Sequence, residues 1–414
     1  MHDRARSLIL PGGKVDPDAV RLTIGEAAGE TEEGEGEGLC RVTFRLSREL
    51  DKRLDKYLTD RIPFMSRTAL QRLIDEGGVT VNGRTCKASQ RLHLNDVVEA
   101  ALPPPPSTEI QPEDIPIEIL YEDESLIVVN KQPGLIVHPA RSHLRGTLLN
   151  ALVHHFRAGG AGGAAGSTGA ALSTVGREFA RPGVVHRLDK HTSGVMVVAK
   201  EDTAHWRLGR QFELRQVEKR YIAIVQGIVE ADADVIEQPI GPHPSRAKGQ
   251  REKQIVRHDE QGKPAVTVFR VRERLFPPES WQKPGRMGGV PEPLRRGFSV
   301  VEMDLKTGRT HQIRVHMSHF GHPLAGDDMY GGTVLDLAWL EALGAPEVAG
   351  AFERQALHAA ALAFRHPITE TPLRFTAPLA RDMHELLGAL RAVYRSSGVL
   401  DVPGAGVDMK ALGA

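Results

Sequence analysis

The sequence predicts an α+β fold, with a large domain built on a mixed, mostly antiparallel sheet and a small α/β domain before it. Apolar runs rich in β-branched residues recur in the second half of the chain and predict strands, namely KRYIAIVQGIV, AVTVFRVRERL and FSVVEMDLK. Segments with apolar residues at helical spacing lie between these runs, which is typical of an α+β domain. A proline-rich stretch at residues 103–116 separates them from an N-terminal part with helix and strand signals of its own.

Length and composition agree with two folded domains. The chain has 414 residues, and a single hydrophobic core stops growing at roughly 250 to 300 residues. Lys plus Arg and Asp plus Glu number 53 each, so total charge neither favours nor excludes a nucleic-acid partner. The distribution is uneven, because residues 25–38 carry six Glu and no basic residue, whereas residues 181–220 carry nine Lys or Arg against five acids.

Compartment and redox class follow from what the sequence lacks. It contains no run of about 18 apolar residues and no secretory signal, so we expect a cytoplasmic protein without a membrane span. Its two cysteines, Cys40 and Cys86, are too few for a disulfide framework or a thiolate metal cluster. Redox chemistry is therefore not expected.

The N-terminal part divides into an extension and a compact domain. Residues 1–44 mix Gly, Glu and Pro without periodicity, and we expect them to be disordered. The compact domain is expected over residues 45–102. Within it, Ser66 is a candidate N-cap for a helix with an apolar face, and Asn82-Gly83 after the run VTV predicts a tight turn between two strands.

The large domain is expected over residues 117–395, after the linker at residues 103–116. Two segments rich in Gly, Pro or polar residues, near residues 157–178 and 274–297, predict insertions that form surface loops. The last segment, residues 396–414, predicts a frayed tail.

One carboxylate of the large domain lies in an unusual local pattern, GVVHRLDKHTSG at residues 183–194. Asp189 is flanked by the strand-like runs GVV and GVMVVAK, so we expect it on a tight connection between buried elements. An Asp beside a Lys is more commonly a surface ion pair. The buried frame favours a functional side chain instead.

Two further segments combine polar groups with apolar patterns. In KRYIAIVQG, Tyr221 alternates with small apolar residues, a pattern that also fits a core tyrosine. In KTGRTHQIRVHMSHFGHP, Thr310 is a candidate cap for a helix with Arg314 in its first turns. An Arg there is unfavourable to the helix dipole, so Arg314 either faces solvent or is held by an anion.

The segments HRLDKHTSG, KRYIAIVQG, GRTHQIRVHMSHFGHPLAGD and LHAAALAFRHP, in that order, resemble the signature segments of RluA-type pseudouridine synthases. The compact domain before the linker resembles an S4 RNA-binding domain, as in the large-subunit ribosomal RNA members of that family. The resemblance implies an enzyme that isomerises specific uridines in RNA to pseudouridine, as a monomer and without a cofactor.

The resemblance also implies roles for individual residues. Asp189 would be the catalytic carboxylate, acting as nucleophile or as base at the ribose. Tyr221 would pack against the uracil, and Arg314 would pair with Asp189 and hold it ionised.

Base flipping and substrate binding would involve further residues. A uridine inside an RNA stack has to be flipped out, and by similarity Arg187 would fill the gap that it leaves. His186 and Leu357 would contribute to the substrate pocket. Four basic residues of the S4-like domain are expected to contact RNA phosphates, namely Arg53, Lys56, Arg67 and Arg72.

Three alternatives stay open at this point. The substrate could be transfer RNA rather than large-subunit ribosomal RNA, or the chain could be a non-catalytic RNA-binding protein. A metal-dependent hydrolase is the third, because four histidines crowd one segment and the spacing of the second and third suits one helix face, namely His311, His316, His319 and His322. That segment has no acidic residue before Asp327, and we expect no metal site.

Overall fold

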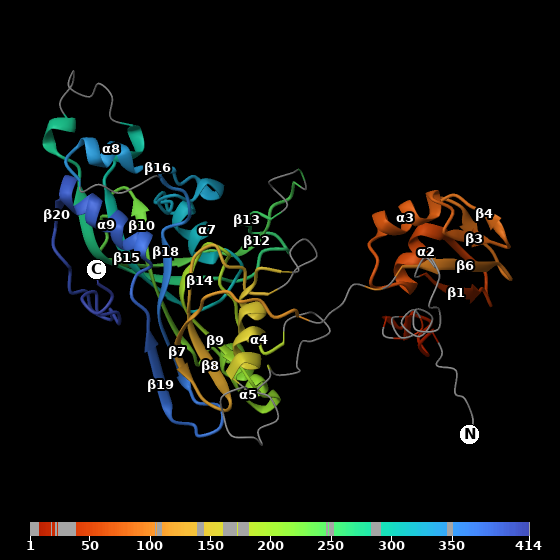
Figure 1. Ribbon diagram of the computed structural model, residues 1–414. Coiled ribbons are helices and arrows are strands. Elements are labelled where there is room, and N and C mark those ends of the chain that lie inside the picture. The colour runs from red at the N-terminus through yellow and green to blue at the C-terminus, as the bar shows by residue number, and fades with distance from the viewer. Residues whose placement is uncertain are drawn as a thin grey trace. The chain divides into compact units, whose positions relative to one another are not determined.

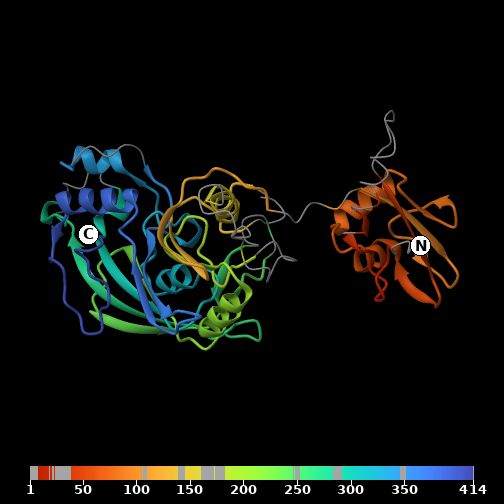
Figure 2. The same cartoon turned by 60° about the horizontal axis from the view of Figure 1, so that its bottom comes forward.

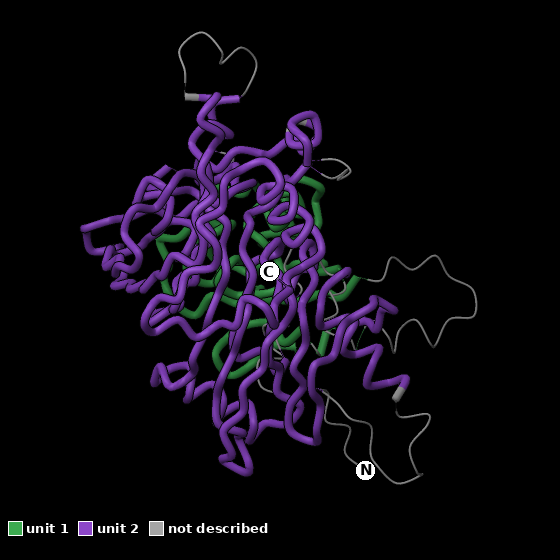
Figure 3. Tube along the Cα trace, turned by 90° about the vertical axis from the view of Figure 1, so that its left-hand side faces the viewer, with its two compact units in different colours: residues 1–107 green, residues 108–414 purple. Residues whose placement is uncertain are grey.

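The structure of the protein is a computed structural model that describes residues 8–17, 19–20, 23, 39–103, 105, 110–138, 145–159, 172, 182–245, 247, 252–282, 291–345 and 351–413. It divides into two compact units, residues 1–107 and residues 108–414 (Figure 3). The acidic stretch and most of the insertion near residues 157–178 lie outside the described residues.

The first unit packs two helices beside a small antiparallel sheet with strand order β1-β6-β3-β4. Ser66 caps the second helix as predicted, because its side chain accepts a hydrogen bond from the backbone N–H of Ala69. Asn82 and Gly83 have φ angles of 53° and 73° and join two paired strands in the predicted tight turn. The elements of this unit are β1 (Cys40–Arg45), β2 (Leu50–Arg53), α2 (Leu54–Arg61), α3 (Arg67–Asp75), β3 (Val79–Val81), β4 (Arg84–Thr85), β5 (Arg91–Leu92) and β6 (Val97–Leu102).

The start of this unit differs from the expected boundary at residue 45. Strand β1 begins at Cys40 and pairs with β6 along its whole length. Its residues alternate between buried and exposed, and Val15 and Val20 from the expected extension are also buried in this core. The short alternating pattern of β1 directly follows an acidic, glycine-rich stretch, and for this reason the sequence did not predict a strand there.

The second unit is built on one large mixed sheet, so the predicted α+β architecture is confirmed. Its main path is β11-β14-β15-β10-β18-β9-β8-β7, with β19 beside β18 and β20 beside β14. The strands are β7 (Glu118–Glu122), β8 (Leu126–Lys131), β9 (Ser193–Ala199), β10 (Glu218–Gln226), β11 (Ala233–Glu237), β12 (Ile240–Pro242), β13 (Gln254–Val256), β14 (Val266–Phe276), β15 (Phe298–Leu305), β16 (Leu335–Asp336), β17 (Ala351–Phe352), β18 (Leu357–Arg365), β19 (Pro372–Thr376) and β20 (Arg395–Ser396).

All of the pairings described in this sheet are antiparallel except the one between β9 and β18, where Ser193 is opposite His358. The helical elements are α4 (Leu148–Gly159), α5 (Asp202–Glu213), η2 (Glu279–Gln282), α6 (Glu292–Arg295), α7 (Gln312–His319), η3 (Asp328–Tyr330), α8 (Leu337–Ala342) and α9 (Arg381–Val393). No helix in the described part of the chain is long and apolar enough to span a bilayer.

Helices cover both faces of the sheet, because alternate residues of its strands are buried on opposite sides. Met196 and Val198 of β9 belong to the core that contains α4 and α7, whereas Val195 and Val197 pack with α5. Helices α8 and α9 cover a further core around β10 and β15. Figure 1 shows α4 and α5 toward one end of the sheet and α8 and α9 toward the other, and Figure 2 shows α8 and α9 packed together.

The C-terminal segment is packed, not frayed as expected. Strand β20 pairs with β14, and Val407, Met409 and Leu412 are buried. The backbone N–H groups of Gly406 and Val407 donate to the fully buried carboxylate of Glu302. A buried carboxylate needs such donors, and the spaced apolar residues of the tail supply the packing.

The insertion near residues 274–297 also contains more structure than the expected surface loop. Strand β14 extends to Phe276, and η2 and α6 follow within the described residues. Leu294 of α6 is buried, and its carbonyl accepts a hydrogen bond from the Tyr394 hydroxyl at 2.7 Å.

Candidate active site

Asp189 lies on a tight connection between two strand segments, as the pattern around it predicted. Val184 forms a bridge with Val198, and β9 begins at Ser193. The backbone N–H of Thr192 donates to the Asp189 carbonyl at 3.1 Å and closes the turn. The Asp189 side chain keeps 22% of its surface exposed, so it can meet a substrate.

The glycine that ends this segment is required by close packing. Gly194 has a φ of 112°, and a Cβ atom there would lie 2.2 Å from the carbonyl oxygen of Ala359. Any side chain would therefore push β9 away from β18. The close approach fixes the loop that carries Asp189 against the centre of the sheet.

A buried lysine holds this loop from behind. Lys131 is 1% exposed, and its Nζ donates to the carbonyls of Gln132, Leu135 and Lys190 at 2.9–3.1 Å. Three carbonyl acceptors match the three protons of an ammonium group. Burial, and then the charge of Arg354, lower the pKa of Lys131 to about 7, while the charge of Asp189 raises it.

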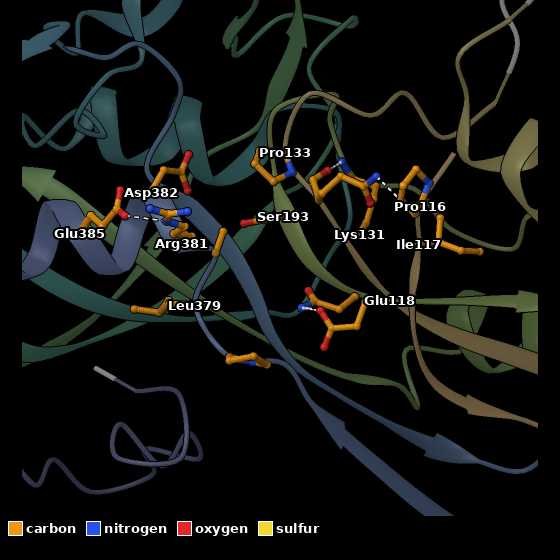
Figure 4. Close-up of a pocket in the computed structure, with 14 residues that line it drawn as sticks. Pro116, Ile117, Glu118, Lys131, Pro133, Ser193, Leu379, Arg381, Asp382 and Glu385 are labelled. Carbon is orange, nitrogen blue, oxygen red and sulfur yellow. Dashed lines mark hydrogen bonds and ion pairs between the residues drawn. The ribbon is translucent and has the colours of Figure 1, made fainter. Parts of the chain in front are cut away.

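A buried arginine holds the next carbonyl of the same loop. Arg354 donates to the His191 carbonyl at 2.9 Å, and its fork binds both oxygens of Asp382 at 2.5 and 2.6 Å. Figure 4 shows Lys131, Ser193 and Asp382 around a cavity of about 840 Å³. Asp189 does not line this cavity, which is therefore separate from the surroundings of the carboxylate.

Arg314 is held by anions, which is one of the two alternatives that the sequence left open. It is the third residue of α7 and is buried. Its main partner is Asp327, which accepts two hydrogen bonds at 2.7 and 2.8 Å, while its Nη1 donates to Asp189 Oδ2 at 3.3 Å. Burial opposes the charge of Arg314, but Asp327 raises its pKa overall. Arg314 therefore makes only one, longer hydrogen bond to Asp189, and its guanidinium group is held in place by Asp327.

The N-cap of the helix that carries Arg314 is His311, not the predicted Thr310. His311 occupies the cap position in the left-handed region with a φ of 56°, and its side chain does not cap the helix. The ring points toward the site instead, with Nε2 3.8 Å from Asp189 Oδ2 and Nδ1 2.7 Å from the Tyr330 hydroxyl. Burial lowers the pKa of His311, which favours a neutral ring.

Tyr330 connects these groups. Its hydroxyl accepts a hydrogen bond from the backbone N–H of Gln254 at 2.9 Å, and its ring lies 4.8 Å from the Arg314 guanidinium. Tyr330 therefore fixes the side chains of both His311 and Arg314.

Two adjoining hollows contain Asp189. The inner recess has a volume of about 70 Å³ and is lined by both polar and apolar side chains, with Tyr221 and Leu357 among the apolar ones. Asp189 is the only carboxylate among its described lining residues. The outer cleft has a volume of about 530 Å³ and shares Asp189 and Tyr221 with the recess. Burial, and then the charge of Asp189, raise the pKa of Tyr221, so its hydroxyl stays protonated at neutral pH.

Basic side chains surround the outer cleft. The described lining includes Arg187, Arg215, Lys219, Lys306 and Arg309, against the acids Asp189 and Glu213. Arg187 is exposed and lines both hollows, two residues before Asp189. A cleft lined by positive charge concentrates anionic ligands such as a nucleic-acid backbone.

His186 contributes a wall and not a free imidazole. Its Nε2 accepts a hydrogen bond from the Val197 backbone N–H at 3.1 Å, and its ring stacks on Phe212 with centroids 4.6 Å apart. Burial lowers its pKa to about 3, so the ring is neutral. His186 therefore contributes an apolar surface to the expected pocket.

The histidine cluster does not form the shared helix face that a metal hydrolase would need. His316 is fully buried and contacts Thr267 and the Gln238 carbonyl, whereas His319 on the same helix is exposed. The described residues contain no group of three His, Cys, Asp or Glu side chains that could hold a metal ion.

Two of the four predicted RNA-binding residues of the first unit are engaged inside it. The guanidinium groups of Arg53 and Arg67 bind the buried carboxylate of Asp55. Burial alone would raise the pKa of Asp55, but these hydrogen bonds lower it. Arg72 pairs with Glu76 one turn away, and Lys56 is exposed.

Five residues of the site were missed by sequence reasoning, namely Lys131, His311 as a site residue, Asp327, Tyr330 and Arg354. Asp327 and Tyr330 follow α7 in the run GDDMYG, where two acids and an aromatic residue stand between glycines. This cluster of polar and aromatic residues between glycines could have indicated that Asp327 and Tyr330 belong to the site. Lys131 and Arg354 give no comparable signal, because their burial depends on strands distant in sequence.

Comparison with known proteins gives consistent matches. Residues 125–319 match the family model described as RNA pseudouridylate synthase, and residues 52–98 match the S4 domain. An uncharacterized RNA pseudouridine synthase of Chlorobaculum parvum is 38% identical over 352 residues, covering 83% of this chain and 96% of the relative. The ribosomal large subunit pseudouridine synthase D of Xylella fastidiosa is 38% identical over 341 residues, covering 82% of this chain and 89% of the relative. The solved structure of human RNA pseudouridylate synthase domain containing 1 is 24% identical with a TM-score of 0.45, covering 72% of this chain and 94% of that chain.

Proposed function

Because the chain belongs to the RNA pseudouridylate synthase family, and is thus an isomerase of uridine in RNA, we propose that Asp189 is its catalytic carboxylate and large-subunit ribosomal RNA its substrate. One observation supports the assignment of Asp189 as the catalytic carboxylate. Asp189 is the only carboxylate among the described residues of a recess whose other lining side chains are apolar, basic or neutral polar.

The reaction explains why such a carboxylate is needed. The bond from ribose C1′ to uracil N1 breaks, the uracil turns, and a bond from C1′ to C5 forms. One proton leaves C5 and one is taken up at N1, so the sum is an isomerisation without a redox step. Asp189 can attack the ribose as a nucleophile or remove a ribose proton as a base, and both roles require an ionised carboxylate aimed at the sugar.

The neighbours of Asp189 orient its carboxylate and leave it able to react with the ribose. Arg314 is fixed by two hydrogen bonds to Asp327 and offers Asp189 only one contact, at 3.3 Å. The positive charge of Arg314 therefore orients Asp189 without forming hydrogen bonds to both carboxylate oxygens. The neutral ring of His311 adds a donor nearby but no second cation.

Tyr221 and Arg187 complete the assignment. Tyr221 stays protonated, so it packs against the uracil and offers a neutral hydroxyl instead of acting as a phenolate base. Arg187, exposed at the rim of both hollows, stacks where the flipped uridine was.

Two features support a large-subunit ribosomal RNA substrate. An S4 domain precedes the catalytic unit, and the Xylella fastidiosa relative, which aligns with 82% of this chain, is named for the ribosomal large subunit. We propose that the enzyme acts as a monomer and in the cytoplasm, where ribosomal RNA is made in bacteria.

The decisive test of the catalytic residue uses RNA labelled with tritium at uridine C5. Formation of the bond from C1′ to C5 expels that hydrogen, so the wild-type protein should release tritium to water without an added cofactor. Asp189→Asn keeps the shape but loses the charge, and its release should fall to background while RNA still binds. Asp328→Asn, the same change at an exposed carboxylate outside the cleft, is the matched control. Normal tritium release by Asp189→Asn would show that Asp189 is not the catalytic carboxylate.

The substrate is tested in cells that lack the protein. Pseudouridines should disappear from large-subunit ribosomal RNA and return with the wild-type gene but not with Asp189→Asn. Loss from transfer RNA alone would instead favour the transfer-RNA alternative.

A further inference from the structure

Helix α5 carries an exposed tryptophan on the face turned away from the sheet. Ala204 and Leu208 are buried and form its inner face. Trp206 lies about 200° around the helix from Ala204 and is 66% exposed. Single exposed apolar side chains are common on protein surfaces, so exposure alone does not assign a partner to Trp206 and its surroundings have to be considered.

Most of the Trp206 side chain remains accessible, at 66% exposure. The ring contact described for Trp206 is edge-on to His205, with centroids 6.0 Å apart and planes at 76°. Gly209 lies one turn further along the same face, and a Cβ atom at this position would meet nothing within 4 Å. Neither a positive φ nor packing requires glycine there, although glycine costs a helix roughly 1 kcal/mol relative to alanine. The result is free space beside an aromatic ring.

The same helix leads to the cleft that contains Asp189. Phe212, Glu213 and Arg215 at its C-terminal end line the outer cleft. Trp206 and Glu213 are seven residues apart and lie on one face of the helix, about 10 Å from each other along its axis. Arg210 is exposed between them and has no side-chain partner among the described residues.

We propose that Trp206 is a stacking platform for a base of the single-stranded RNA that flanks the target uridine. Stacking on tryptophan accepts any base, because every base has a flat π face, and Arg210 and Arg215 supply charge for the intervening phosphates. This inference rests on the proposed function and adds a contact outside the catalytic cleft. A protein partner at the same face is the competing occupant.

The test measures binding of a uridine-rich single-stranded 12-nucleotide RNA to full-length Asp189→Asn protein, which binds without turnover. Trp206→Ala should weaken binding about 5- to 100-fold and leave its salt dependence unchanged, since stacking releases no counterions. Trp206→Phe should retain most of the affinity. Gly209→Leu should also weaken binding by filling the free space, whereas Gly209→Ala serves as the control.

Tryptophan fluorescence gives a second readout. Bound RNA should quench the emission of the parent protein, and Trp206→Phe should remove that quench. An unchanged dissociation constant for Trp206→Ala, or a quench that persists in Trp206→Phe, would overturn the proposal and leave a protein partner as the occupant. Since these measurements need no turnover, their failure is distinct from a failure of tritium release.

Discussion

Arg314 binds two carboxylates in different ways, and this predicts an informative pair of variants. It makes two short hydrogen bonds to Asp327, which is 1% exposed, and one longer bond to Asp189. Arg314→Ala leaves the Asp327 charge buried without a partner, and breaking a buried pair in this way costs about 3 to 5 kcal/mol of unfolding free energy. It also removes the donor that orients Asp189, so kcat should fall by about 100-fold or more.

The double variant Arg314→Ala with Asp327→Ala separates the two effects. It contains no orphaned buried charge at Asp327, so its unfolding free energy should exceed that of Arg314→Ala. Its kcat should stay low, because Asp189 still lacks its donor. Arg314→Lys should recover little activity, since an ammonium group cannot replace a fork that spans both carboxylates.

Urea unfolding and tritium release under saturating RNA measure the two quantities on the same samples. Arg272→Ala is the matched control, because Arg272 is a buried arginine whose partner, Glu302, lies away from the cleft. It should lose stability but keep its turnover at a temperature where it remains folded. Near-normal turnover of Arg314→Ala, or recovery of turnover in the double variant, would refute the proposed orienting role.

Three further predictions follow from other parts of the structure. Excess EDTA should leave tritium release unchanged on an RNA whose folding is controlled for; activity lost and then restored by zinc would point to an unrecognised metal site. Removal of residues 1–107 should leave a folded unit that binds RNA more weakly and with less salt dependence, and a folded product inactive on saturating RNA would contradict this division of labour. Because burial lowers the pKa of Lys131 to about 7, the unfolded chain binds more protons at this group between pH 7 and about 10.5. Its contribution to the unfolding free energy should therefore rise with pH over that window, and equal slopes for wild type and Lys131→Met in urea unfolding would disprove this.

Local patterns were sufficient for much of the fold and for the centre of the site. Apolar runs predicted the strands that flank Asp189 and the strand that contains Tyr221, and the helix-start position of Arg314 left two alternatives, solvent or an anion. Both inferences depend on neighbours within about ten residues, which a single sequence displays.

The remaining features depend on partners far away in the chain. Lys131 and Arg354 hold the loop after Asp189 through carbonyls more than 50 residues distant, whereas Asp327, the main partner of Arg314, lies 13 residues along the chain. The buried carboxylate of Glu302 likewise orders the C-terminal segment, whose own composition resembles a loose tail. Such contacts arise from the order of strands in the sheet, which the hydrophobic pattern does not specify.

The position of β18 has a consequence for synthesis of the enzyme. Asp189 precedes β9 and Tyr221 lies in β10, yet these two strands flank β18, which is made more than 130 residues later. A nascent chain that ends before Leu357 therefore contains both side chains but cannot bring them to one recess. Because domains form their distant contacts only after the participating segments have left the ribosome, activity should appear late in translation, and a prematurely terminated product should not modify RNA.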